Sequence, residues 1–411
     1  MKKLLGITLG IMTALGGFVD LGQIVFTTQA GALFGYQLLW AIALGTVAII
    51  VYMEMCGRIA VVAREPVFAI VRDRLGLPLG SATLIASNLL NLLTCSAELG
   101  GLAIVIHLLT GWPEKFVLFG VGVGLPLLVY VSKFEWIERI FGLSGLLMVT
   151  FAVSAVALHP NWKALAAGMI PHVNFTGHHD LLLYAYFAVG IFSAMLMEYE
   201  VHFYSSGAIE ENWKVKDLSE NFMVASLGSV LGSLLTVALL ALGALVFLPH
   251  HIFPEQLSSS LLTGAWPYGQ KALLLGCLGA LACIGGAGIE TALSGAYNLC
   301  QFFNWRWGKD LPPKSAKIYT AAWIGTFVLA LAIAFSGIRP LQLVNFSIIF
   351  GMAIMPFTYY PILRVAADKK IMGKHVNTKT DTVVGVVFLV LIVVAAAVSF
   401  PLMILTHSGQ P

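Results

Sequence analysis

The sequence predicts an all-α, polytopic membrane protein. Of its 411 residues, 59% are apolar and only 10% are charged, whereas soluble domains are about 25% charged. The apolar residues form long runs, and most basic residues fall in the breaks between them. A helix needs roughly 20 apolar residues to span a bilayer, and helices satisfy the backbone of such runs in lipid. The composition therefore excludes a soluble enzyme and a nucleic-acid-binding protein.

Eleven apolar runs are long enough to span a bilayer, and the short breaks between them leave no room for a sizeable extramembrane domain. We therefore expect residues 1–411 to form a single membrane domain. The runs lie near residues 6–28, 34–56, 79–110, 115–132, 140–159, 181–205, 222–248, 270–301, 318–337, 341–363 and 382–406.

The distribution of lysine and arginine predicts how these spans are oriented. Cytoplasmic loops carry an excess of basic residues. With the N-terminus in the cytoplasm, eleven spans place all but four of the 23 basic residues on the cytoplasmic side. The four exceptions are Lys115, Lys163, Lys271 and Arg339. We therefore expect a multi-pass protein of the cell membrane with a cytoplasmic N-terminus and an external C-terminus.

A few acidic residues fall inside the apolar runs. Charges in the hydrocarbon region are costly, so each is a candidate functional residue. Glu54 has a simpler explanation, an ion pair with Arg58 at i,i+4 spacing, and Glu290 lies among small residues where a structural hydrogen bond is equally expected. The full set is Asp20, Glu54, Glu98, Glu198, Glu200 and Glu290.

Spans 1 and 6 have the most polar interruptions. Asp20 has Gly16, Gly17 and Gly22 nearby, and glycine permits the backbone to leave helical geometry. Span 6 contains AMLMEYEVHFYSSG from residue 194 onward. Two interrupted spans five apart are typical of an inverted repeat whose broken helices bind the transported solute. We expect discontinuous spans 1 and 6, one repeat near 6–159, a second near 181–363, and an extra span near 382–406.

Several segments resemble the Nramp family of divalent metal transporters, and the resemblance covers nearly the whole chain. DLGQIVFTTQAGALFGYQLLW (20–40) is similar to the family's DPGN motif and the start of its second span. AELGGLAIVIHLLTG (97–111) resembles the third span, and PFTYYPILRVAADKKIMGKHVN (356–377) resembles the end of the tenth. The resemblance implies a LeuT-like fold, a five-plus-five inverted repeat with an eleventh helix. It also implies a metal ion as substrate and no cofactor.

The resemblance also implies a metal site. Asp20 matches the aspartate of the family motif, and Gln23 stands at its asparagine. In span 6, Ala194 matches the position that offers a backbone carbonyl, and Met197 matches the metal-binding methionine. Glu198 stands at the family's proline, Tyr199 at its first histidine and Glu200 at its asparagine. Tyr204 stands at the second histidine, and Ile348 lies near the span-10 glutamine.

The positions that the family associates with proton movement differ in this chain. Glu98 matches the glutamate of the family's span-3 pair, but Cys95 stands at the aspartate. Tyrosine replaces both span-6 histidines, and a neutral tyrosine is a poor proton relay near pH 7. Proton coupling is therefore doubtful. A related branch that transports magnesium shows similar losses, but it also loses the methionine that this chain keeps.

The donor types favour a divalent cation without fixing which one. A carboxylate, an amide oxygen and a backbone carbonyl suit hard ions, and the Met197 thioether favours Mn²⁺ or Fe²⁺ over Mg²⁺. Glu198 and Glu200 instead add hard donors that suit a hydrated Mg²⁺. On a helix, Glu198 and His202 share a face at i,i+4. Glu98 and His202 are candidates for tuning the charge of the site or for a residual proton path. For His202, a buried histidine that only makes a hydrogen bond is an equally good interpretation.

The leading hypothesis is a monomeric secondary transporter that moves Mn²⁺- or Fe²⁺-type ions into the cytoplasm by alternating access. The first alternative is an Nramp-related Mg²⁺ transporter without proton coupling. The second alternative is a carrier of the same fold for a non-metal solute, since fold does not fix function. Metal-dependent quenching of a dye inside liposomes separates a metal transporter from such a carrier. A membrane sensor or membrane-embedded enzyme is the last, and the sequence has no HExxH, GxSxG or phosphate-binding motif to support an enzyme.

Overall fold

The computed structural model describes residues 19–173 and 177–410, and within them the chain is helical and has no strand. In this part of the chain, ten helices or helix pairs are long and apolar enough to cross a membrane. They are α3 (Leu39–Val62), α4 (Val67–Thr110), α5 (Glu114–Val131), α6 (Phe134–Gly145) with α7 (Val149–Ala157), α9 (His178–Met195) with α10 (Glu198–Glu210), α11 (Leu218–Leu242), α13 (Gln270–Phe302), α14 (Lys317–Phe335), α15 (Pro340–Ala366) and α17 (Lys379–Leu405). The remaining α-helices are α2 (Leu21–Phe34), α8 (Trp162–Ala167), α12 (Leu257–Leu262) and α16 (Lys369–Met372).

These ten elements match the second to eleventh predicted spans one by one, so the all-α, multi-pass architecture is confirmed. The first predicted span, 6–28, falls largely outside the described residues. Its described end, from Leu21, forms the start of α2. The largest difference is in span 3, because α4 begins twelve residues before the predicted start at 79. Gly76 explains this: its φ of 74° breaks the helix just before Pro78, and a positive φ favours glycine.

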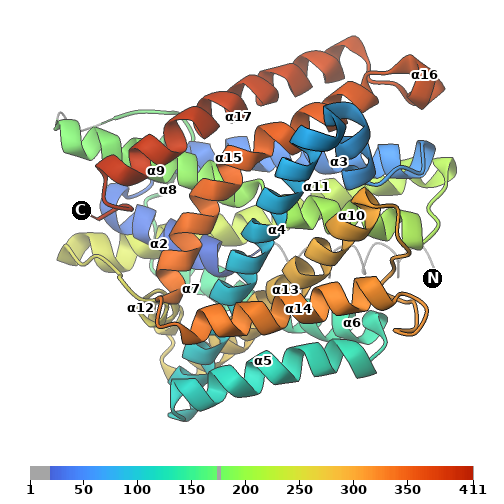
Figure 1. Cartoon of the computed structure of the whole chain (residues 1–411). Coiled ribbons are helices and arrows are strands. Elements are labelled where there is room, and N and C mark those ends of the chain that lie inside the picture. The colour runs from blue at the N-terminus through green and yellow to red at the C-terminus, as the bar shows by residue number, and fades with distance from the viewer. Residues whose placement is uncertain (1–18, 174–176, 411) are drawn as a thin grey trace.

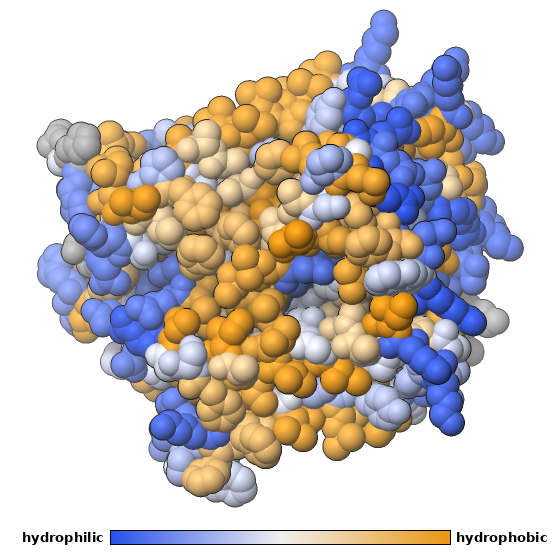
Figure 2. Space-filling model, viewed as in Figure 1, coloured by the Kyte–Doolittle hydropathy of each residue, from blue (hydrophilic) through white to orange (hydrophobic). Residues whose placement is uncertain are grey.

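The most buried helices lie at the centre of the bundle. The α9–α10 pair and α13 have the largest buried shares, whereas α5, α14 and α17, along the outside, have the smallest (Figure 1). Figure 2 shows the consequence: a broad apolar surface covers the middle of the visible face, and hydrophilic residues gather toward its left and right edges. An apolar belt of this kind is what a bilayer requires of the surface that it surrounds.

Two glycines bring α2 and α11 into contact at the backbone. A Cβ at Gly31 would overlap the carbonyl oxygen of Leu240. In the opposite direction, a Cβ at Gly243, directly after α11, would overlap the carbonyl oxygen of Thr28. Only residues without a side chain permit this approach. The contact fixes the position of α2, whose first residues lie at the candidate site described below.

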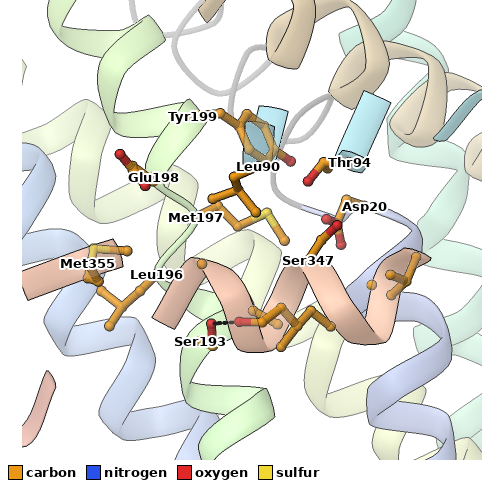
Figure 3. Close-up of a pocket in the computed structure, with 15 residues that line it drawn as sticks. Asp20, Leu90, Thr94, Ser193, Leu196, Met197, Glu198, Tyr199, Ser347 and Met355 are labelled. Carbon is orange, nitrogen blue, oxygen red and sulfur yellow. Dashed lines mark hydrogen bonds between the residues drawn. The ribbon is translucent and has the colours of Figure 1, made fainter. Parts of the chain in front are cut away.

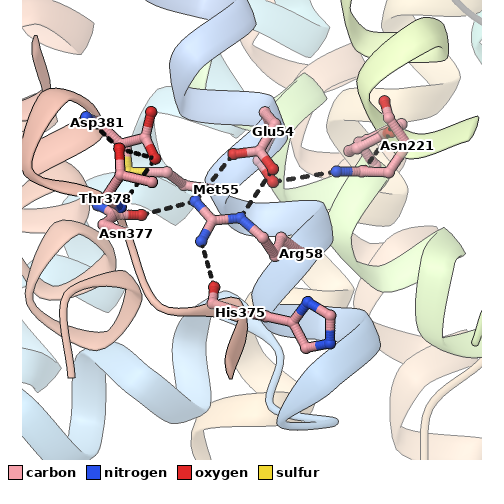
Figure 4. A network of polar contacts seen from close by, with 9 residues as sticks. Glu54, Met55, Arg58, Asn221, His375, Asn377, Thr378 and Asp381 are labelled. Atoms are coloured by element: carbon pink, nitrogen blue, oxygen red, sulfur yellow. Dashed lines mark hydrogen bonds and ion pairs between the residues drawn. The ribbon is translucent and has the colours of Figure 1, made fainter. Parts of the chain in front are cut away.

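The ion pair of Arg58 and Glu54 joins three parts of the fold (Figure 4). Its Nε donates to Glu54 Oε1 at 2.8 Å, which confirms the predicted i,i+4 pair within α3. Its Nη1 and Nη2 donate at 2.6 Å to the His375 carbonyl and to Asn377 Oδ1, both in the segment between α15 and α17. Asn221 of α11 in turn donates to the Glu54 carbonyl at 3.2 Å. Arg58 therefore connects α3 to the segment before α17, and Glu54 connects it to α11.

Lys309, in the loop after α13, makes a second buried charged contact. Its Nζ lies 2.8 Å from Glu138 Oε1 of α6, and its backbone N–H donates to Glu210 Oε1 of α10 at 2.7 Å. Burial alone would lower the pKa of this lysine, but the carboxylates of Glu138, Glu211 and Glu210 outweigh it and raise the pKa above its ordinary value. The lysine therefore stays charged and joins α6 to the end of α10.

The Arg58 network predicts a measurable loss of stability. We expect Arg58→Met to lower the free energy of unfolding by about 2 kcal/mol, because it leaves Glu54 and Asn377 without their shared partner. The measurement is the apparent melting temperature of the purified protein in detergent. Arg139→Met is the matched control, since its i,i+4 pair with Glu135 is largely exposed and exposed pairs contribute little. Equal melting temperatures for the two variants would contradict this account of the network.

Candidate metal site

Asp20 lies at the N-terminus of α2. Its backbone is extended, with φ −82° and ψ 179°, and its side chain accepts a hydrogen bond from the Gln23 N–H at 2.8 Å. This is an N-cap, which satisfies one of the free N–H groups at the start of a helix. The helix dipole also favours a negative charge at this end. The fold thus places a buried carboxylate at a helix start.

The predicted break in span 6 is confirmed. Helix α9 ends at Met195, Leu196 and Met197 have non-helical backbone angles, and α10 begins at Glu198. The last carbonyls of a helix have no partner within that helix. The break therefore leaves carbonyls at the end of α9 next to the Met197 thioether, in the middle of a membrane span.

Gln23 and Ala194, two predicted ligands, are hydrogen-bonded to each other. The Gln23 amide nitrogen donates to the Ala194 carbonyl at 3.0 Å. Thr236 of α11 lies 3.5 Å from the Gln23 carboxamide oxygen and donates to it. The start of α2 is thereby joined to the broken span 6. In this arrangement the Gln23 amide and the Ala194 carbonyl bind each other, so neither is fully free to bind an ion.

A small cavity lies between the start of α2, the break in span 6, α4 and α15 (Figure 3). Its volume is about 40 Å³, and a cavity needs at least about 10–15 Å³ to hold one water molecule. Asp20 and Met197 both line it. The other lining residues are Gly22, Leu90, Thr94, Ser193, Ala194, Leu196, Glu198, Tyr199, Val344, Ser347, Ile348, Gly351 and Met355.

Four residues with hydroxyl groups line the cavity, and the sequence analysis did not propose them as site residues: Thr94, Ser193, Tyr199 and Ser347. The Tyr199 and Ser347 hydroxyls are buried, and within the described chain they have no hydrogen-bond partner. One signal pointed toward Ser347, because its neighbour Ile348 stands near a family ligand position. Which side of a helix faces a cavity depends on its tertiary packing, and the sequence did not show it.

Glu198 and His202 lie together, as their spacing predicts. His202 Nε2 is 3.6 Å from Glu198 Oε1, and the same carboxylate oxygen accepts a hydrogen bond from the Ser87 hydroxyl of α4. The His202 ring packs edge-on against Phe68, with 5.1 Å between ring centroids. Glu198 lines the cavity, but in Figure 3 its carboxylate points away from Asp20.

Glu98 and Glu200 are both buried, but they have different surroundings. Glu98 Oε1 accepts a hydrogen bond from the Leu21 N–H at 3.3 Å, so this carboxylate lies beside the start of α2, one residue from Asp20. Glu200 is not among the residues that line the cavity. One oxygen of each carboxylate has no partner among the described residues. Such groups are costly in a dry interior, which marks both as candidates for hydrated or protonated groups.

The structure brings some predicted site residues together and separates others. Asp20, Ala194, Met197 and Glu198 line one cavity, Gln23 lies beside it, and Glu200 lies apart. Within residues 19–173 and 177–410, no group of three or more His, Cys, Asp or Glu side chains is placed to hold a metal ion. An ion in this cavity must therefore use mixed donors: one carboxylate, one thioether, backbone or hydroxyl oxygens, and water.

Known proteins match the chain over most of its length. Residues 10–400 match the family model "Nramp: Natural resistance-associated macrophage protein-like". The divalent metal cation transporter MntH of Deinococcus radiodurans is 25% identical over 388 residues, covering 92% of this chain and 85% of that protein. MntH of Bacillus subtilis is 24% identical over 392 residues, covering 92% and 87%.

Solved structures show the same fold. A crystal structure of a variant of the Eremococcus coleocola manganese transporter aligns with a TM-score of 0.73 at 18% identity, covering 99% of this chain and 88% of that one. MhsT in complex with L-phenylalanine aligns with a TM-score of 0.64 at 15% identity, covering 98% of both chains. The LeuT-like fold implied by the family resemblance is therefore confirmed. With the family model matched across nearly the whole sequence, the chain belongs to the Nramp family of divalent metal cation transporters.

Proposed function

We propose that this chain moves Mn²⁺- or Fe²⁺-type ions into the cytoplasm by alternating access, without tight coupling to protons. The observation that carries the proposal is the cavity that Asp20 and Met197 both line, each at the N-terminus of a helix. A carboxylate supplies the negative charge that a divalent cation needs. The thioether is a softer donor, which favours Mn²⁺ or Fe²⁺ over Mg²⁺ and Ca²⁺.

The size of the cavity supports an ion as cargo. A volume of about 40 Å³ accommodates an ion with a few water molecules. An organic solute would need a much larger space, since small-molecule sites are typically about 300–1,000 Å³. The carrier of a non-metal solute is therefore the weaker alternative, although the fold also occurs in MhsT, whose structure holds L-phenylalanine.

Neutral groups stand at positions that the Nramp family associates with proton movement, and they support uncoupled transport. The Cys95 thiol lies 3.6 Å from the Gly288 carbonyl and donates to it. The Tyr204 hydroxyl donates to Asn221 Oδ1 at 2.7 Å, so it belongs to the network around Glu54. Neither group is ready to take up a proton near neutral pH. Glu98, beside the start of α2, is the remaining candidate for a residual proton path.

Uptake into liposomes tests the proposal directly. With the purified chain reconstituted and an indicator dye inside, we expect Mn²⁺ entry that exceeds protein-free liposomes and no matching acidification. A pH-sensitive dye in parallel vesicles measures the proton flux. Entry of Mg²⁺ with no entry of Mn²⁺ would favour the magnesium alternative, and acidification in a fixed ratio to metal would refute uncoupled transport.

Asp20→Asn tests the principal ligand. We expect uptake of Mn²⁺ to fall by at least about tenfold, because the neutral amide removes the negative charge of Asp20 from the cavity wall. Initial uptake rates at equal protein content measure the effect. Glu135→Gln, which changes an exposed carboxylate, is the control and should leave the rate unchanged. Normal uptake by Asp20→Asn would eliminate the proposed site.

Met197→Leu tests the softer donor at nearly constant volume. We expect competition by Cd²⁺ against Mn²⁺ uptake to weaken by about five- to tenfold, with Mg²⁺ competition unchanged, because only the sulfur is lost. Met355→Leu is a matched control, since Met355 lines the same cavity but lies far from Asp20 in Figure 3. If the two variants gave the same competition profile, Met197 would serve only in packing.

A further inference from the structure

The cavity offers a divalent cation too few protein ligands. Asp20 supplies one carboxylate and Met197 one thioether. The Gln23 amide is directed at the Ala194 carbonyl, and the Glu198 carboxylate points away from Asp20. Hard divalent cations take about six or more ligands and keep waters where the protein does not replace them. The remaining ligands must therefore come from water and from the backbone or hydroxyl oxygens of the cavity.

Tyr199 brings a hydroxyl group to the wall of this cavity. Its side chain is 3% exposed and lines the cavity, and its hydroxyl has no hydrogen-bond partner among the residues described. In Figure 3 the phenol points toward the side of the cavity that holds Thr94 and Asp20. A buried hydroxyl without a partner is unfavourable unless water or a ligand meets it.

The position of Tyr199 is fixed from two sides. Its ring packs in one cluster with Met197 and Ala287. Its backbone carbonyl accepts a hydrogen bond from the Ser294 hydroxyl of α13 at 2.7 Å. The phenol oxygen is therefore held in place before an ion arrives, and a preorganised group loses little conformational freedom on binding.

We propose that Tyr199 is a positioning residue for a partly hydrated divalent cation, whose bound water donates a hydrogen bond to the phenol oxygen. A water bound to a cation directs its hydrogens outward, so the phenol oxygen acts as the acceptor. The inference rests on the proposed transport of divalent cations and adds that the ion is bound together with water. It follows that Tyr199 favours ions that keep their water.

Tyr199→Phe removes the hydroxyl and keeps the ring. We expect the dissociation constants of Mn²⁺ and Mg²⁺ to rise by about three- to tenfold, the effect of losing one hydrogen bond. That of Cd²⁺ should rise less than about twofold, because the thioether holds this softer ion. The measurement is calorimetric titration of the full chain in detergent with each metal salt alone.

Tyr186→Phe is the matched control. Tyr186 also carries a buried hydroxyl without a partner in the described chain, but it does not line the cavity. We expect its metal affinities to equal those of the wild type. The inference would be overturned if Tyr199→Phe kept wild-type affinities for all three ions, or if its affinities for Cd²⁺ and Mn²⁺ fell equally. Either result would leave the proposed function intact as long as the wild type binds metal. A wild type that binds no metal would overturn the proposed function as well.

Discussion

The structure depends on one constraint, that backbone polar groups inside a bilayer need partners. Each unsatisfied group costs several kcal/mol in hydrocarbon, so a helix that ends within the membrane must satisfy its free ends locally. Here two helix ends do so next to each other. Asp20 caps α2, and the Ala194 carbonyl at the end of α9 accepts a hydrogen bond from the Gln23 side-chain amide. The candidate site is the space left between these ends.

This constraint also explains why the acids concentrate at the site. The free N–H groups and the dipole of a helix N-terminus favour negative charge, and Asp20, Glu198 and Glu200 all lie in or next to a first helical turn. Glu98 reaches the same region from α4 and accepts the Leu21 N–H. Helix ends thus permit carboxylates at a depth where a continuous helix would exclude them. In the proposed function, the Asp20 carboxylate at such a helix end supplies the charge that attracts the cation.

The sequence predicted the fold well because its signals are local. Hydropathy determines the length of each span, and the ten that the structure describes agree with it. The break in span 6 was also expected, since Glu198 and Glu200 interrupt an apolar run. The repeat boundaries at 6–159 and 181–363, the orientation of the termini and the monomeric state stay predictions.

The site was only partly predictable. Asp20 and Met197 line one cavity as expected, because a family motif places them. The Gln23–Ala194 hydrogen bond and the separate position of Glu200 depend on how helices rotate against each other. The Tyr199 and Ser347 hydroxyls were missed for the same reason. A hydroxyl in a mid-membrane helix has no sequence pattern that separates a cavity residue from a packed one.

The glycine contact between α2 and α11 has a mechanical consequence. Because Gly31 and Gly243 bring the two backbones against each other, neither helix has room to slide or roll past the other. Gln23 and Thr236 add a polar contact between the same helices. The pair is therefore expected to move as one rigid body. In the alternating access proposed above, opening the cavity to either side would then be a rotation of that body, which carries the Asp20 carboxylate along with it.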